Sequence, residues 1–396
     1  MNADRLVVSA LAGLLWGAGV LVGAQASQPG AGAGGGLLVY FGTYTGGKSK
    51  GIYVSRLDAA TGVLGVPSLA AESVNPSFLA VHPSGKYLYA VNEVDNFEGA
   101  RAGAASAFAI APTGALRPLN QSSTRGTGPC YLSLDRTGRH LLVANYGGGS
   151  VAVLPVGTDG RLGPATAFVQ HETIAADPQK PRRPHGHSID LEPSNRFALV
   201  ADLGLDRVLV YRLTDKGGLV PNDPPFAAMD PGAGPRHVAI HPSGRSVYVL
   251  QEKHMTVDTF GFDAVRGVLT HKQKVSSLPE GVAVAEGFSG AEILVHPSGR
   301  FVYASNRGHD TIAVFAIDED QGTVKLIEHV ASGGKTPRGF GIDPSGRWLL
   351  AGNQRSDTVS VFRIEASTGR LTNTGQSVEV GAPVSVAFAA APPAAK

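Results

Sequence analysis

Side chains that could do chemistry occur in this sequence at two recurring positions, the start of one apolar run and the end of the run that follows it. The starts of runs contribute His185, His187, Arg236, His237, Glu292 and Arg338. The ends of runs contribute Glu93, Asn145, Tyr146, Asp202, Glu252, Asn306, Arg307, Asn353 and Gln354. Guanidinium groups bind carboxylates and phosphates through pairs of parallel hydrogen bonds. If the fold gathers these residues at one opening, we expect a binding site for a small anionic molecule. The alternative is a polar channel in which the charges only pair with one another.

The apolar runs belong to an internal repeat. Residues 336–364 show the pattern most fully: an apolar run, a Pro-Ser-Gly turn, a second apolar run, a short polar turn and a third run. Similar stretches occur at 75–92, 128–145, 185–202, 234–251 and 290–306, and successive turns are 53, 57, 49, 55 and 47 residues apart. A repeat of roughly 40–50 residues with several strand patterns per copy is typical of a β-propeller, in which each copy forms one four-stranded blade.

The two ends of the chain supply one further copy. Residues 37–57 match the second and third strands of a copy, and residues 382–388 match a first strand. Joined, they would complete a seventh blade, and closing the ring removes the exposed sheet edges that favour aggregation. We therefore predict an all-β fold, a seven-bladed β-propeller of four-stranded antiparallel blades in one domain, residues 37–389.

Strand direction assigns the reactive residues to one face of the ring. Within a blade the chain runs down, up, down and up, so the start of the first strand and the end of the second lie at the same rim, here called the site rim. The Pro-Ser-Gly turns lie at the opposite rim, the turn rim. His82, His241 and His296 begin three of these turns, so we expect them to be structural or simply solvated.

Charge and composition exclude several classes of partner. The 396 residues carry a net charge of +2 without a long block of like charges, so nothing favours a nucleic acid or an anionic membrane. The single cysteine, Cys130, excludes an internal disulfide and is expected to be a small buried residue. The longest insertion, residues 171–184, falls at the site rim, where Lys180, Arg182 and Arg183 either extend the anion site or form a solvated basic loop. A closed ring with mixed surface charge has no evident need of a protein partner, and we expect a monomer.

The first 36 residues differ from the repeats. Arg5 precedes an apolar stretch, residues 6–24, and Ala24-Gln25-Ala26 matches a signal-peptide cleavage site. We interpret residues 1–26 as a secretory signal peptide; the alternative is an uncleaved membrane anchor, since about 19 apolar residues nearly span a bilayer. Under both interpretations the propeller is exported from the cytoplasm, either to the periplasm or out of the cell. Residues 27–36 are interpreted as a Gly/Ala-rich linker, whose formal match to G-x-G-x-x-G reflects low complexity, and residues 390–396 as a C-terminal tail.

Four segments resemble a known family. They are Gly-His-Ser at 186–188, Gly-Pro-Arg-His at 234–237, and the longer stretches 291–307 and 337–362. Together they are similar to the seven-bladed propeller lactonases, which include bacterial 6-phosphogluconolactonases of the propeller type and fungal carboxy-muconate lactonizing enzymes. The resemblance covers residues 39 to about 388. It implies four catalytic residues on the central face: His187, Arg236, Glu252 and Arg307. One difference is Gln251, where the family often has asparagine.

The resemblance implies hydrolysis of a sugar-acid lactone. The two arginines would hold the anionic group and stabilise the charge on the carbonyl oxygen, and His187 and Glu252 would form an acid–base pair whose roles stay unassigned. The expected substrate-binding residues are His185, His237, Glu292, Arg338, Asn353 and Gln354. We expect no cofactor and no metal, and as ligand a small anionic lactone or sugar acid. Export argues against a phosphorylated substrate, because phosphorylated sugar lactones belong to cytosolic metabolism.

Several alternatives stay open. The chain could be a muconate-type cycloisomerase, or a binding or scaffold propeller without turnover. His185 and His187, on one face of a strand, could bind a metal together with Asp202 or Glu252, although arginines nearby would repel a cation. Ser188 could be a nucleophile, but its surroundings depart from the G-x-S-x-G pattern.

Overall fold

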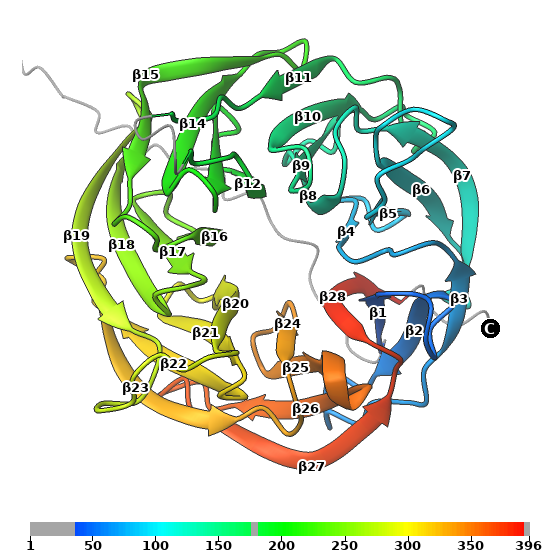
Figure 1. The fold of residues 1–396 in the computed structure, drawn as a ribbon. Helices are drawn as coiled ribbons and strands as arrows, with labels where there is room; N and C mark the ends of the chain where they lie inside the picture. The colour runs from blue at the N-terminus through cyan, green and yellow to red at the C-terminus, as the bar shows by residue number, and fades with distance from the viewer. Residues whose placement is uncertain (1–35, 176–180, 392–396) are drawn as a thin grey trace, which may run out of the picture. The chain divides into compact units, whose positions relative to one another are not determined.

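The computed structural model describes residues 36–175 and 181–391. These residues form seven four-stranded antiparallel sheets arranged as a ring, which confirms the predicted seven-bladed propeller (Figure 1). Within the described residues, helical structure is limited to one short 3-10 turn, η1 (Gln354–Ser356), and none of it could cross a membrane. The predicted signal peptide and nearly all of the predicted linker lie outside the described residues.

Blades 1 to 6 each contain four consecutive strands. Blade 1 contains β4 (Leu79–Val81), β5 (Tyr87–Asn92), β6 (Ala104–Ile110) and β7 (Leu116–Ser123). Blade 2 contains β8 (Pro129–Leu134), β9 (His140–Asn145), β10 (Ser150–Pro155) and β11 (Ala167–Gln170). Blade 3 contains β12 (Gly186–Leu191), β13 (Phe197–Asp202), β14 (Arg207–Leu213) and β15 (Leu219–Ala228). Blade 4 contains β16 (Pro235–Ile240), β17 (Ser246–Gln251), β18 (Thr256–Asp263) and β19 (Val268–Ser276). Blade 5 contains β20 (Ser289–Val295), β21 (Phe301–Arg307), β22 (Thr311–Ile317) and β23 (Val324–Ala331). Blade 6 contains β24 (Pro337–Ile342), β25 (Trp348–Asn353), β26 (Thr358–Ile364) and β27 (Leu371–Glu379).

Blade 7 is built from both ends of the chain. Its spatial order is β28 (Pro383–Ala390), β1 (Leu37–Thr43), β2 (Gly51–Leu57) and β3 (Ser68–Glu72). The first of these pairs antiparallel with the second, with Leu37 opposite Ala390 and Thr43 opposite Pro383. In Figure 1 the red β28 lies beside the blue β1. The ring is therefore closed by strands from both termini, as predicted.

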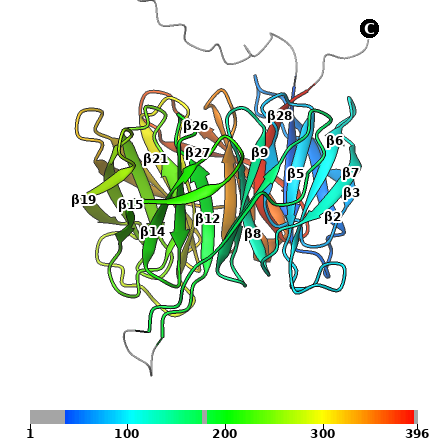
Figure 2. The ribbon, with the colours of Figure 1, turned by 90° about the horizontal axis from the view of Figure 1, so that it is seen from above.

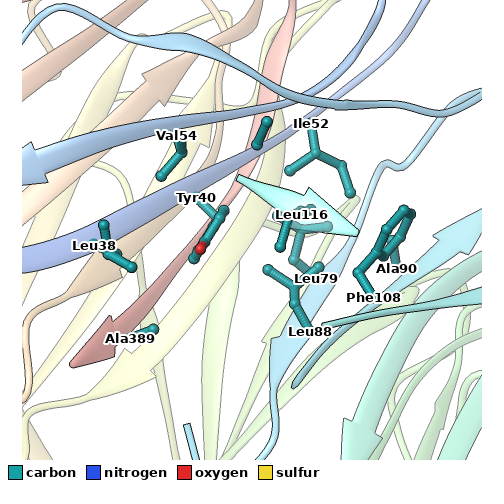
Figure 3. Close-up of a cluster of buried hydrophobic side chains, with 11 residues drawn as sticks. Leu38, Tyr40, Ile52, Val54, Leu79, Leu88, Ala90, Phe108, Leu116 and Ala389 are labelled. Carbon is teal, nitrogen blue, oxygen red and sulfur yellow. The ribbon is translucent and has the colours of Figure 1, made fainter. Parts of the chain in front are cut away.

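The hydrophobic core lies between neighbouring blades. Strands β9, β13, β17 and β25 are buried at every position, as expected for runs that lack polar alternation. Figure 3 shows the cluster where blade 7 meets blade 1, with Leu38 and Tyr40 of β1 near Leu79 and Leu88. Each large apolar side chain that is fully buried there contributes roughly 1.5–3 kcal/mol relative to an exposed one. The Tyr40 hydroxyl donates to the Gly114 carbonyl at 2.9 Å, so its polar end is also satisfied.

The strands run between the two rims of the ring (Figure 2). At the turn rim, His82, His241 and His296 each donate through Nε2 to a glycine carbonyl in the corresponding turn of the next blade. The three donor–acceptor distances are 3.1, 2.8 and 2.8 Å. These histidines therefore connect blades, which is the structural role expected for them.

Candidate active site at the site rim

In each of blades 2 to 7, the first strand has a β-bulge near its start. The bulge leaves one or two residues of that strand unpaired. First strands are the innermost strands of the ring (Figure 1), and their pairing with second strands shifts register close to the site rim. The residues left unpaired by these shifts are Cys130, His187, Arg236, Ala291 with Glu292, Arg338 and Val384. Bulges re-aim side chains and are frequent beside active sites. The bulge therefore explains how a repeating sheet presents a different residue from each blade.

In several blades, a polar residue at or next to the end of the second strand is hydrogen-bonded within the fold. The residue that follows it lies at the site rim. Asn353, which the sequence placed among substrate-binding residues, is fully buried and donates to the Ser332 carbonyl and to Ser360 Oγ at 3.2 and 3.1 Å. Asn145 makes equivalent bonds in blade 2. The residues that follow these positions are Tyr44, Glu93, Tyr146, Leu203, Glu252, Arg307 and Gln354. We therefore leave Asn353 out of the candidate site.

Arg236, Glu252 and Arg307 form one ion-pair cluster. Oε2 of Glu252 lies 2.9 Å from Arg236 Nε and 3.1 Å from Arg307 Nη2. Both guanidinium groups also donate to carbonyls of the blade 5 bulge: Arg307 to Gly290 at 2.9 Å, and Arg236 to Ala291. The Arg236 side chain is only 3% exposed, so a charge is held almost out of water. The structure thus brings three of the four residues implied by the resemblance into direct contact.

The charge states of this cluster follow from its surroundings. Burial acts to raise the pKa of Glu252, but Arg236 and Arg307 outweigh it and lower the pKa below its ordinary value. Burial, followed by repulsion from Arg236, lowers the pKa of Arg307 to about 9. At neutral pH the cluster therefore contains one carboxylate and two cations, a net charge of +1.

His237 and Glu292 form a bonded chain with Arg236. Nη1 of Arg236 is 3.0 Å from His237 Nε2, and His237 Nδ1 is 2.7 Å from Glu292 Oε1. A guanidinium only donates, so Nε2 must accept and the imidazole proton must lie on Nδ1, where it is donated to Glu292. Both side chains are almost fully buried. These bonds hold Arg236 in place, and His237 also lines the central pocket. The substrate contacts expected for His237 and Glu292 from the sequence stay a prediction.

His187 lies beside this pair, with its ring centroid 5.2 Å from that of His237 and 5.3 Å from that of Tyr146. Burial, and then the charge of Arg236, lower the pKa of His187 well below 6.5. The imidazole is therefore neutral at pH 7 and able to accept a proton. The thiol of Cys130 is 3.7 Å from Nδ1 and donates to the His187 carbonyl at 3.4 Å, and burial raises its pKa. Cys130 is thus buried, as expected from the sequence.

Arg338 belongs to the opposite side of the same opening. Its Nη2 donates to the Tyr44 hydroxyl at 2.9 Å, and that hydroxyl donates to Glu93 Oε2 at 2.8 Å. Ser77 Oγ donates to the same carboxylate oxygen at 2.5 Å. The pocket between the two sides is lined by Tyr44, Ser77, Phe78, Glu93, Cys130, Arg236, His237, Arg338 and Val384. Sequence reasoning missed Tyr44 and Ser77; the available signal was that Tyr44 follows the last residue of a second strand, as Glu252 does.

The remaining sequence-predicted residues lie at the edge of this opening or have other partners. His185 stacks on Tyr146 with ring centroids 4.7 Å apart, and its Nδ1 donates to the Tyr146 carbonyl at 3.0 Å. Asp202 is bound to His171 Nδ1 at 2.6 Å. Gln354 is half-buried in η1.

Ser188 and the candidate metal ligands belong to two alternatives that the sequence left open. Ser188 Oγ is buried and has no hydrogen-bond partner among the described residues, so no base activates it there. Within residues 36–175 and 181–391, no group of three or more His, Cys, Asp or Glu side chains is arranged to hold a metal ion. In the basic loop, Arg182 lies 3.4 Å from Asp206, Arg183 is exposed, and Lys180 lies outside the described residues.

The site therefore combines a neutral imidazole, two buried guanidinium groups that share a carboxylate, and a third guanidinium across the opening. Such a set can activate a water molecule and stabilise negative charge that develops on an oxygen atom.

Comparisons with known proteins identify the family of this chain. The model of the family described as "Lactonase, 7-bladed beta-propeller" matches residues 38–388. The chain is 35% identical over 350 residues to a 6-phosphogluconolactonase of Bacillus subtilis, covering 88% of this chain and 97% of that protein. It is also similar to a periplasmic gluconolactonase of Pseudomonas aeruginosa, with a TM-score of 0.83 and 35% identity over 90% of this chain and all of the other. This chain belongs to the family of seven-bladed β-propeller lactonases.

Proposed function

We propose that this protein hydrolyses a sugar-acid lactone at the site rim, with His187 as general base. The observation that carries the proposal is a neutral His187 packed against His237, which in turn bonds Arg236 of the Arg236–Glu252–Arg307 cluster. Family membership supports the same reaction class. The expected product is the open-chain hydroxy acid.

The proposed mechanism has two steps. His187 accepts a proton from water while the water oxygen attacks the lactone carbonyl carbon, and the resulting oxyanion accepts hydrogen bonds from a guanidinium group. The tetrahedral intermediate then collapses, the bond from carbon to ring oxygen breaks, and the protonated His187 returns its proton to that oxygen. The proton count balances, and no cofactor is consumed.

Glu252 has a different role in this proposal. No salt bridge among the described residues engages the His187 imidazole, whereas the Glu252 carboxylate is engaged by two arginines. Its two ion pairs hold Arg236 and Arg307 side by side. We therefore assign Glu252 to positioning these cations and His187 to proton transfer, a choice that the sequence left open.

We also propose that the protein is exported. The signal-like pattern at residues 1–26 supports this, and so does the likeness to a protein described as periplasmic. Detection of the propeller in the periplasmic fraction, with its N-terminus determined by mass spectrometry, tests both export and cleavage after Ala26. A full-length chain in the cytosol would contradict the proposal.

The enzymatic proposal is tested by measuring the opening of glucono-δ-lactone and of its 6-phosphate by the purified protein, with and without a chelator. Both rates must be corrected for spontaneous opening. We expect acceleration of at least one lactone that is unchanged by the chelator. Loss of activity with chelator would favour the metalloenzyme alternative, and no acceleration of either lactone would favour a binding propeller.

A further inference from the structure

Three neighbouring blades bring four polar residues together across the opening from Glu252. Tyr44 follows β1 of blade 7, Ser77 and Glu93 flank β4 and β5 of blade 1, and Arg338 is in β24 of blade 6. Their side chains line the same pocket as Arg236. We call Tyr44, Ser77, Glu93 and Arg338 the distal cluster.

The hydrogen bonds of the distal cluster use only part of its capacity. Tyr44 OH and Ser77 Oγ both donate to Oε2 of Glu93, at 2.8 and 2.5 Å, whereas Oε1 accepts no hydrogen bond from the described residues. Arg338 donates through Nη2 to Tyr44 and stacks near its ring, with Cζ 5.2 Å from the centroid. Among the described residues, no salt bridge engages the Arg338 side chain, in contrast to Arg236 and Arg307. One carboxylate oxygen and several guanidinium N–H groups therefore remain for a ligand.

The mixed character of these groups indicates the ligand's chemistry. A hydroxyl group both donates and accepts, so two neighbouring hydroxyls fit a carboxylate oxygen and a guanidinium placed side by side. A phosphate only accepts when fully ionised, and the Glu93 carboxylate would repel it. A site for phosphate would instead surround it with donors alone.

We propose that the distal cluster is a subsite for the hydroxyl groups of an unphosphorylated, polyhydroxylated lactone. The proposal rests on the lactonase function proposed above and specifies the substrate class of the same site. Glu93 accepts from the substrate hydroxyls, and Arg338 donates to them while the lactone carbonyl faces the Arg236–Glu252–Arg307 cluster. The distal cluster thereby determines specificity and takes no part in proton transfer.

Two lactones of the same ring size test the proposal. Glucono-δ-lactone carries the hydroxyls, and δ-valerolactone has none. Because a site built to bind substrate hydroxyls discriminates against analogues that lack them, we expect the wild-type kcat/KM to favour glucono-δ-lactone by about 100-fold or more. Glu93→Gln and Tyr44→Phe should lower kcat/KM for glucono-δ-lactone by about 10- to 100-fold, chiefly through KM, and change that for δ-valerolactone by no more than about twofold. Glu93→Gln should also narrow the preference for glucono-δ-lactone over its 6-phosphate.

Glu365→Gln is the matched control, because it removes an exposed carboxylate at the turn rim; it should alter neither lactone's kinetics. Equal losses on both lactones, or no loss with glucono-δ-lactone, would overturn the subsite. A wild-type protein that opens neither lactone would instead overturn the proposed function. The subsite is then tested alone by calorimetric titration with gluconate: binding that is lost in Glu93→Gln supports it, and binding that is absent or unchanged overturns it.

Discussion

The two rims of this propeller use the same strands in opposite ways. At the turn rim, three blades repeat one arrangement, a histidine that donates to the glycine of the next turn. In the other complete turns an acid, such as Asp343, accepts from the backbone of its own turn. At the site rim, equivalent positions hold a different residue in almost every blade. Positions that hold the same residue type in several blades therefore serve the fold, and positions whose residue differs from blade to blade are the candidates for binding and catalysis.

The same contrast holds within the site rim. Asn145, Asn306 and Asn353 lie at or next to the end of their second strands, make similar hydrogen bonds and serve the fold. The residues directly after them are Tyr146, Arg307 and Gln354, which share no chemistry. Mutations at the asparagine positions should therefore lower stability. Mutations at the positions directly after them should chiefly affect activity.

Apart from loss of the proposed base His187, the largest loss of activity is expected for Arg236→Lys. A lysine keeps the charge but cannot bond Glu252, His237 and Ala291 together, so kcat should fall by about 100- to 1,000-fold. Arg245→Lys, at an exposed position of the turn rim, is the control and should retain full activity. Steady-state kinetics on glucono-δ-lactone measures both, and an equal effect of the two changes would remove the distinction between the rims.

A smaller loss of activity is expected when Arg236 is kept but Glu292, which bonds the His237 imidazole next to it, is changed. In Glu292→Gln the His237 tautomer is no longer fixed by a carboxylate, so we expect kcat to fall by about tenfold with little change in KM. The acid limb of the pH–rate profile, which belongs to His187 in the proposed mechanism, should stay in place. A lower melting temperature with an unchanged kcat would indicate a purely structural role.

A still smaller effect on activity is expected from Arg338→Gln, which should shift the pH dependence of the reaction. The fold lowers the pKa of His187 well below 6.5, so this base is neutral at pH 6.5 and activity should decline only at more acidic pH. Arg338 contributes to that shift, so Arg338→Gln should move the acid limb upward toward 6.5. The logarithm of kcat/KM plotted against pH gives the limb directly. A limb at or above pH 6.5 in the wild type would be inconsistent with His187 as the base.

At the turn rim, changes should affect stability and leave activity intact. Gly346 has φ +71°, and a Cβ there would lie 2.5 Å from the His296 ring. Gly85 occupies the same turn position with φ +69° and nothing within 4 Å of its Cβ. Gly346→Ala should cost about 2–4 kcal/mol of the free energy of unfolding, against about 1–2 kcal/mol for Gly85→Ala, which bears the backbone strain alone. Equal costs in denaturant titrations would show that the histidine contact is not restrictive.

The fold and the site were predictable from the sequence to different degrees. The spacing of the turns and the half-copies at the two ends indicated seven blades and their closure, because buried strands and tight turns depend on local residue types. Strand direction also placed His187, Arg236, Glu252 and Arg307 at one rim. The catalytic roles of these four residues remain predictions.

The finer arrangement of the site depends on bulges, on hydrogen-bond partners and on ring closure, which cannot be inferred from residue types alone. The bulge in blade 4 takes Arg236 out of the regular strand pairing, so Arg236 forms an ion pair with Glu252 while its neighbour His237 bonds Arg236 and Glu292. Asn353 looked suited to a ligand but is used by Ser332 and Ser360. Tyr44 belongs to an incomplete copy of the repeat, and only ring closure places it beside Arg338.

Catalytic residues are expected at the site rim and purely structural residues at the turn rim. A comparison of His187 at the site rim with His241 at the turn rim tests this division most directly. The initial rate of glucono-δ-lactone opening should be compared for the wild type, His187→Ala and His241→Ala under the same conditions. We expect His187→Ala to lower the catalysed rate by about 100- to 10,000-fold, and His241→Ala to retain the wild-type rate with reduced stability. Full activity of His187→Ala, or equal losses in both variants, would contradict the assignment of His187 and the division between the rims.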